Sequence, residues 1–490
     1  GAYAVAVGRN SGSSTQSIDA VAIGNSAGNR GQGAQAVAIG KESGRALVFY
    51  TDFVSKAVSA HEYPDFTLVV VSTANLLPGM HVNGTGYTSK QTILSVDDAT
   101  TLTMSADSDS TPSGTLTFIG GQGADSVAIG YRTGYNNQGE RAIAIGRSAG
   151  LVNQSTYAVA IGYQAGQTTQ GSYAQAIGYL AGETNQGAYS VAIGRDAGMT
   201  NQGEYSVAIG KGAGETTQSE DAIAIGWGAG QIAQGEEAIA IGSSAGETNQ
   251  GIEAIAIGDN AGETNQGQEA IAIGQFAGET TQGANAVAIG KDAGTTTQGA
   301  NAIAIGDDAG QTTQGTYGIA LGTQAGETTQ GTGGIAIGYQ AGQTNQDTGT
   351  VAIGTTAGTT TQGEDAVAVG TNAGKTTQGT DAVAIGHSAG ETSQGAGAIA
   401  IGYNAGSTNQ AANSIVINAG GLALENTQED SLKIVPIRSA TMTTILGYNA
   451  ATGEVTHNAA IPGYTNTADL KALVAASADF ADYQTRIAAL

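Results

Sequence analysis

A 16-residue internal repeat constrains this chain more than any other feature of its sequence. A glycine that follows a run of alternating small and branched residues stands at Gly8, Gly24 and Gly40, and then at every sixteenth residue from Gly130 to Gly402. The resulting 21 units read A-[VI]-A-I-G-x-x-A-G-x-T-[TN]-Q-G-x-x. A repeat of this kind is typical of a solenoid, in which each unit stacks on its neighbours.

Each unit predicts two short strands and two corners. The residues Ala302-Ile303-Ala304-Ile305 alternate with the period of 2 of a β-strand, which places both isoleucines on one face. Gly306 and Gly310 bracket a sharp corner, and the T-[TN]-Q stretch offers a second strand. We therefore predict an all-β fold, a parallel β-solenoid (β-roll) of 16-residue coils. At roughly 4.8 Å per stacked strand, it forms a rod of about 100 Å.

A glutamine stands eight residues after the repeat glycine in nearly every unit. Stacked coils place these amides above one another, where they can hydrogen-bond as a structural ladder rather than bind a ligand. The predicted ladder includes Gln16, Gln32, Gln138, Gln154, Gln170, Gln186, Gln202, Gln218, Gln250 and Gln410.

The repeat is interrupted once. Its register is kept on both sides of the break, so a separate domain leaves one corner of the third coil and returns to it. Short strands are expected in this domain at 68–71, 92–96, 101–104 and 115–118. The predicted organisation is 1–44 (coils 1–3), 45–121 (an inserted β-sandwich or barrel), 122–411 (the continued solenoid), 412–465 (a C-terminal β cap) and 466–490 (a helix).

The C-terminal segment predicts an amphipathic helix that begins at Asn466 or Thr467. Large apolar residues follow at the 3–4 spacing of a short coiled coil, although Ser477 and Gln484 are polar members of the same seam. Packing of this helix on its own chain remains the alternative. The predicted trimerisation seam consists of Leu470, Leu473, Phe480 and Ile487.

Composition excludes several classes of function. There are 17 Lys and Arg against 41 Asp and Glu, and the net charge of −24 argues against a nucleic-acid-binding surface. No apolar run is long enough for a membrane span, and no cysteine is present. We therefore expect neither nucleic acid nor membrane insertion among the partners.

Sequence motifs give no catalytic, cofactor or metal site. Gly386-His387-Ser388-Ala389-Gly390 matches the G-x-S-x-G of hydrolases, but other units replace its serine, so the match follows from the repeat. Glu247, Glu263 and Glu279 occupy one position in three successive coils, where we expect an exposed row of screened charges rather than a cation site. We predict that the protein is not an enzyme and uses no cofactor.

A row of threonines raises the possibility of an ice-binding face. Thr312 and Thr313 are adjacent in a predicted strand, so their side chains are expected on opposite sides. A single outward row argues against that activity.

One coil offers too few large apolar residues to form a core by itself, which predicts that chains associate and supports a homotrimer. The sequence leaves open whether the Ala face or the Val/Ile face meets the three-fold axis; an Ala face would allow the chains to approach closely. Gln175 replaces a branched residue and is expected to destabilise the fold if this position is buried.

The unit Ser-Val-Ala-Ile-Gly, as at Ser206–Gly210, resembles the head repeat of trimeric autotransporter adhesins of the YadA type. The resemblance covers about 1–44 and 122–411. It implies a left-handed parallel β-roll, three chains side by side and an adhesive function. The present repeat is a residue or two longer than is usual in that family, and its T-[TN]-Q-G half differs.

Other segments resemble viral proteins. Leu77–Gly86 resembles a β-module of phage and giant-virus structural proteins, and 435–438, 444–448 and 479–484 are similar to tails of viral fibre proteins. This implies an extracellular tail or capsid fibre on a virion, with a host receptor or glycan and other virion proteins as partners. A bacterial cell-surface adhesin or extracellular filament subunit is the alternative. In either setting, the inserted domain is the candidate receptor-binding part, and a mere spacing role is its alternative.

Overall fold

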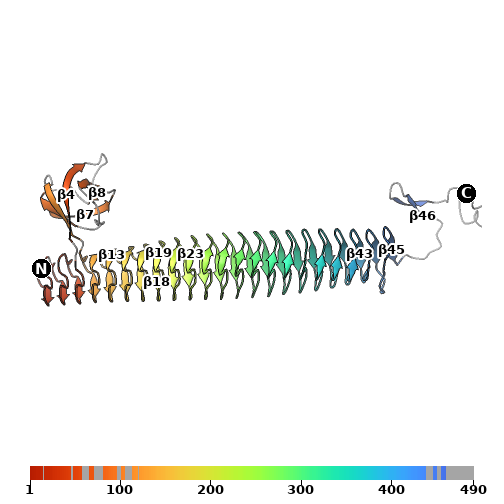
Figure 1. The fold of residues 1–490 in the computed structure, drawn as a ribbon, viewed down its shortest axis with the longest axis horizontal. Helices are drawn as coiled ribbons and strands as arrows, with labels where there is room; N and C mark the ends of the chain where they lie inside the picture. The colour runs from red at the N-terminus through yellow and green to blue at the C-terminus, as the bar shows by residue number, and fades with distance from the viewer. Residues whose placement is uncertain are drawn as a thin grey trace, which may run out of the picture. The chain divides into compact units, whose positions relative to one another are not determined.

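A computed structural model describes residues 1–14, 16–45 and 121–436, together with the backbone of strands between 48 and 119 and between 445 and 458. These residues form strands, turns and loops, and no helix lies among them. The repeats stack as a parallel β-solenoid, with one coil for each repeat, from β1 to β45 (Figure 1). The predicted fold class is confirmed.

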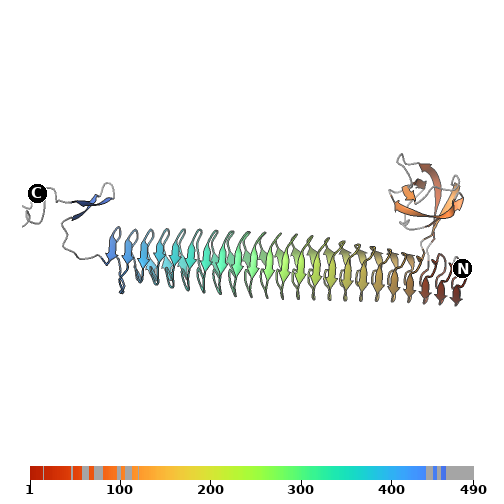
Figure 2. The same ribbon diagram turned by 180° about the vertical axis from the view of Figure 1, so that it is seen from behind.

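The first strand of every coil joins one continuous sheet of 23 strands, which we call sheet A. It begins with β1 (Val5–Val7), β2 (Val21–Ile23) and β3 (Val37–Ile39). It continues from β10 (Val127–Ile129) to β43 (Ile399–Gly402) with one new strand in each repeat. Neighbouring strands are parallel and in register, so that Val127 lies beside Ile143 and Ala128 beside Ala144. The view from behind shows the same stacking of one strand per coil (Figure 2).

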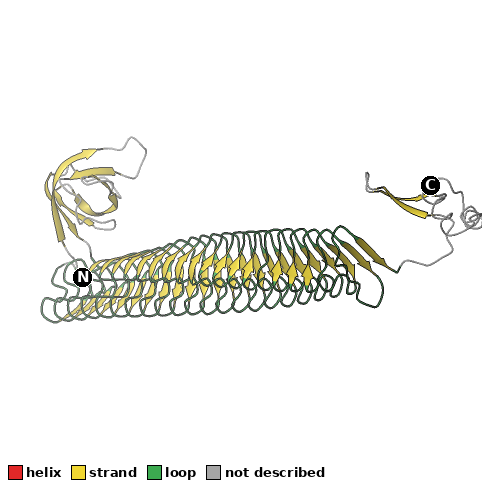
Figure 3. Ribbon diagram, turned by 45° about the vertical axis from the view of Figure 1, so that its right-hand side comes forward, coloured by secondary structure: helices red, strands yellow, loops and turns green. Residues whose placement is uncertain are grey.

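The T-[TN]-Q stretches form the predicted second row of strands, which we call sheet B. Three-residue strands recur once per repeat from β11 (Asn136–Gln138) to β27 (Thr264–Gln266). Shorter two-residue strands follow from β29 (Thr281–Gln282) to β35 (Thr329–Gln330) and from β38 (Thr361–Gln362) to β42 (Ser393–Gln394). Turns and loops join the two sheets in every coil (Figure 3).

Alanine and glutamine fill the inside of the solenoid. In the coil around β14 (Val159–Ile161), the side chains of Ala158, Ala160, Ala165 and Gln170 are all completely buried. The branched residues of sheet A point outward instead. The possibility that the Ala face meets a neighbouring chain is therefore wrong, because so short a coil encloses a narrow interior that admits only these small side chains and one extended amide.

Glycine is required at the corners by close approach between coils. Gly178 has φ +143°, and a Cβ there would collide with the carbonyl oxygen of Gly194 in the next coil. Gly182 has φ +54°, and its Cβ would lie 2.7 Å from Oε1 of Gln186. These two contacts explain why both glycines recur in the repeat.

The solenoid is continuous across the insertion. Strand β3 pairs directly with β10, and Gln32 bridges to Gln122, although the whole inserted domain separates these strands in sequence. The insertion itself forms a closed antiparallel barrel in the order β4-β5-β8-β7-β6-β9. Its strands are β4 (Val48–Ala57), β5 (Phe66–Val70), β6 (His81–Thr85), β7 (Tyr87–Val96), β8 (Thr101–Met104) and β9 (Ser113–Ile119).

Sheet A extends beyond residue 411, where we expected the solenoid to end. Strand β44 (Ile415–Asn418) continues the register of β43, and β45 (Leu432–Val435) follows it. The side-chain amide of Asn418 takes the place of the repeat glycine and donates to the carbonyls of Tyr403 and Leu422. A separate unit, 434–490, contains the hairpin of β46 (Ile445–Asn449) and β47 (Glu454–Asn458).

Candidate functional site

The outer surface of sheet A carries two rows of mainly branched apolar side chains, which we call the branched face. The first residue of each strand is half-buried in most coils, and the third residue is half-buried or exposed. Ile161, Ile305 and Ile385 remain 36%, 39% and 40% exposed in the single chain. Soluble monomers rarely expose apolar surface over such a length, so this face has the properties of an interface.

Gln175 belongs to the branched face. It pairs in register with Val159 and Val191, and its side chain is exposed. Gln175 was expected to destabilise the fold only if its position is buried. Because the side chain is exposed, we expect no such cost within one chain.

Two rows of mainly polar, charged and aromatic residues border the branched face. The leading edge consists of the residues two positions before each sheet A strand, such as Tyr157, and the trailing edge consists of the residues directly after the repeat glycine, such as Tyr163. At the leading edge the rings of Tyr157, Tyr173, Tyr189 and Tyr205 stack at centroid distances of 4.8, 5.0 and 5.2 Å. The trailing edge mixes aromatic residues with cations.

Contacts between rings and cations order the trailing edge. Arg147 lies over the rings of Tyr131 and Tyr163, at 5.8 and 5.6 Å from their centroids, and Lys211 lies 5.7 Å from the centroid of Trp227. We did not anticipate either edge from the sequence. The available signal was the recurrence of tyrosines and charges at two fixed positions of the repeat.

The predicted glutamines lie in one buried row. Gln154 Nε2 donates to the carbonyl of Ile143 at 2.8 Å and to Gln170 Oε1 at 3.2 Å, and Gln170 donates in turn to Gln186 at 3.0 Å. Gln32 and Gln250 bond carbonyls of sheet A in the same way, as does the half-buried Gln16. The amides thus link successive coils and join the two sheets. That this role is purely structural stays a prediction.

The expectation for the threonine row is wrong. Thr312 and Thr313 are both exposed, because Gln314 alone turns inward from this short strand. The strand at this level consists only of Thr313–Gln314, so the two adjacent threonines do not follow the alternation of a regular strand.

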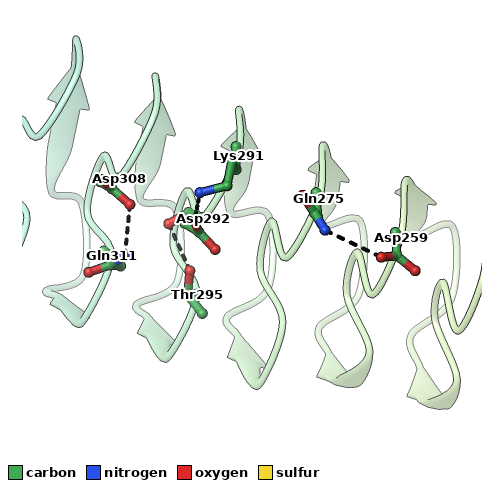
Figure 4. Close-up of polar contacts among 7 residues, drawn as sticks. All are labelled: Asp259, Gln275, Lys291, Asp292, Thr295, Asp308 and Gln311. Atoms are coloured by element: carbon green, nitrogen blue, oxygen red, sulfur yellow. Dashed lines mark hydrogen bonds and ion pairs between the residues drawn. The ribbon is translucent and has the colours of Figure 1, made fainter.

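Among the described residues, one cluster of carboxylates has the spacing of a metal site, and the sequence did not point to it. Ligand atoms of Asp292, Asp307 and Asp308 all lie within 4.8 Å of one another, and carboxylate oxygens suit Ca²⁺ or Mg²⁺. However, Lys291 Nζ lies 2.5 Å from Asp292 Oδ2, and Gln311 Nε2 donates to Asp308 at 2.8 Å (Figure 4). The lysine already compensates part of the negative charge, and the glutamine amide gives Asp308 a hydrogen-bond donor.

The predicted glutamate row is more enclosed than expected, since Glu247, Glu263 and Glu279 are half-buried. Asn260 donates to Glu263 at 2.8 Å. Burial raises the pKa of Glu279, and the charge of Glu263 raises it further. Burial likewise raises the pKa of Asp308, with smaller contributions from its acidic neighbours. The rod therefore carries carboxylates whose ionisation costs free energy.

Ser388 of the G-x-S-x-G match is buried at a corner between two strands, without the helix that follows a hydrolase nucleophile. Leu470, Leu473, Phe480 and Ile487 lie outside the described residues. Among the described residues, no helix has the length and apolar character needed to cross a membrane.

Comparison with known families identifies part of the repeat. Residues 282–309, 348–373 and 378–405 match the YadA head domain repeat. Neither a curated protein nor a solved structure gives a significant match. The match confirms that these coils are YadA-like repeats, of a type found in adhesive surface fibres rather than enzymes.

Proposed function

We propose that the chain forms a rigid homotrimeric fibre, in which three solenoids pack through their branched faces and present a binding region to a host surface. The observation that carries this proposal is the outward direction of the valines and isoleucines along sheet A. Side chains such as Ile305, which is 39% exposed in the single chain, would each contribute roughly 0.5–1 kcal/mol on packing, a part of the value for burying a fully exposed side chain.

A second copy of the same chain is the occupant that fits this face. A covering partner has to present apolar side chains over about 100 Å with the spacing of stacked strands. The branched face itself has this length and spacing. Heads of the YadA type form homotrimers and bind host surfaces in general, and the matched repeats support the same assembly for this chain.

We further propose that this fibre is a tail or capsid fibre on a virion. It is supported by the similarity of 435–438, 444–448 and 479–484 to viral fibre tails. A bacterial cell surface suits the YadA-like repeats equally well. Immunogold labelling of virions and of host cells distinguishes the two locations.

Sedimentation of the full chain tests the assembly. We expect a mass near three times 48.3 kDa. Ile305→Lys, on the branched face, should weaken the trimer because it introduces a charge at each of three contacts. Thr313→Lys is the matched control, since Thr313 is exposed in sheet B at a nearby level. A stable wild-type monomer, or equal effects of both substitutions, contradicts the proposal.

A further inference from the structure

The two edges of the branched face carry opposite charge. Over the 21 repeat coils, whose edge residues all belong to the described part of the chain, the leading edge has eight carboxylates and one cation. The trailing edge has six lysines and arginines and two carboxylates. The leading-edge carboxylates are Asp19, Asp125, Asp221, Glu237, Glu253, Glu269, Asp365 and Asp381; the trailing-edge cations are Arg9, Lys41, Arg147, Arg195, Lys211 and Lys291.

These side chains are accessible to a neighbouring chain. Asp221 and Glu237 are exposed at the leading edge, and Lys211 is exposed at the trailing edge. Arg195 keeps 55% of its side chain exposed, although it also lies 3.4 Å from Asp196. Lys291 and Asp125 are likewise paired within the chain, at 2.5 Å from Asp292 and 3.6 Å from Arg141. The exposed surface of these groups nevertheless leaves them accessible beside the branched face.

Geometry determines which edges meet when branched faces come together. If the rods are parallel, rotation about the rod axis brings the trailing edge of one chain next to the leading edge of the other. If the rods are antiparallel, leading edge meets leading edge and trailing edge meets trailing edge. Parallel packing thus joins opposite charges, whereas antiparallel packing joins like charges.

We propose that the trailing-edge cations of one protomer and the leading-edge carboxylates of the next form an electrostatic seam that selects parallel chains. This inference rests on the proposed trimer and adds the rule by which its chains choose their orientation. Apolar burial is non-directional and would hold the rods in either direction. The seam supplies the preference, since juxtaposed like charges oppose association.

Charge reversal on the full chain tests the seam. Arg195→Glu with Lys211→Glu reverses the trailing edge of two coils, and Asp221→Lys with Glu237→Lys reverses the leading edge of the two coils that follow. At low ionic strength, either pair should weaken the trimer at least about tenfold. The chain with all four substitutions should regain the trimer, because its edges are complementary again.

Orientation is measured in the same variants by energy transfer. The natural chain has no cysteine, so Thr377→Cys, an exposed site in β40 (Thr377–Gln378) near one end of the solenoid, accepts a single label. A mixture of donor- and acceptor-labelled chains should give efficient transfer when rods are parallel. Antiparallel rods would hold the labels most of the rod length apart.

The outcomes separate the two proposals. A wild-type monomer overturns the trimer itself. A wild-type trimer that ignores both paired reversals, or that the fourfold substitution fails to restore, overturns the seam and leaves the trimer standing. Low energy transfer within a wild-type trimer likewise overturns the parallel orientation.

Discussion

The small distance between neighbouring coils and the narrow interior limit which residue types each position of the repeat can hold. Gly178 and Gly182 leave no room for a Cβ, and Ala160 fills an interior position completely. Gln202 is the long exception, since it reaches across the interior to the carbonyl of Val191 at 2.9 Å and to Gln218 at 3.2 Å. Buried amides of this kind are acceptable only when they are paired.

Substitution of Gln202 by leucine tests the structural role of the ladder. The volume is nearly kept, but the Val191 carbonyl loses its side-chain donor and Gln186 loses its acceptor. We expect a loss of about 1–3 kcal/mol in the free energy of unfolding, seen as a lower thermal midpoint by circular dichroism. Gln268→Leu, at an exposed position, should leave the midpoint unchanged. A midpoint unaffected by Gln202→Leu contradicts the role.

Gln175 tests the branched face at one residue. Its neighbours in sheet A are Val159 and Val191, so valine here completes the apolar row. We expect Gln175→Val to strengthen the trimer by about 1 kcal/mol per chain, because more apolar surface leaves water on assembly. Stability of the coil itself should change little, as the side chain points outward. Weaker association in sedimentation equilibrium would instead show that the amide makes a polar contact between chains.

At the scale of elements, stacking brings charged groups of neighbouring coils close enough to shift one another's pKa. Asp308 lies near Asp307 in its own coil and Asp292 in the preceding one, and burial together with these two charges raises the pKa of its carboxyl. The folded chain therefore binds this proton more tightly than the unfolded chain. Ionisation opposes folding, so the destabilisation is absent below the ordinary carboxyl pKa of about 4 and complete above the raised value.

The raised pKa of Asp308 predicts that Asp308→Asn stabilises the chain. It should raise the thermal midpoint at pH 7, and the gain should vanish at about pH 3, where the native carboxyl is protonated in both states. Asp430→Asn, at an exposed position, serves as the control and should not stabilise the chain. An equal gain at both pH values would assign the effect to packing rather than to charge.

At the scale of the whole molecule, a regular rod repeats the same backbone in every coil, and the inserted barrel is its largest irregularity. Recognition is carried more often by such irregular parts on a rigid scaffold. A trimer carries three copies of the barrel, so weak single contacts can combine into firm attachment.

Removal of the barrel tests this assignment. Residues 45–121 are replaced by Glu-Thr-Thr, the corner found at 215–217. The rod should assemble with an unchanged thermal midpoint, because β3 and β10 already pair in register. Attachment to host cells should be lost. A deleted fibre that attaches as well as the intact one would place the receptor site elsewhere, toward an end of the rod.

The amino-acid sequence by itself determined the solenoid, because a 16-residue period with two glycine corners permits few other structures. It also located the insertion, since the register of Gly40 and Gly130 survives the break. The position of the glutamine row followed from the same period. These features depend on local geometry and on spacing, which are read directly from one chain.

Only the tertiary structure decided which side of sheet A is inside. Alternation places Ala304 and Ile305 on opposite sides but does not say which side the coil encloses. That choice depends on the width of the closed coil, which admits Ala304 and excludes Ile305. Once the isoleucines are outside, the residues beside them become the edges of an interface. Only this arrangement shows that the charges of those edges lie beside the proposed interface, which the sequence alone did not show.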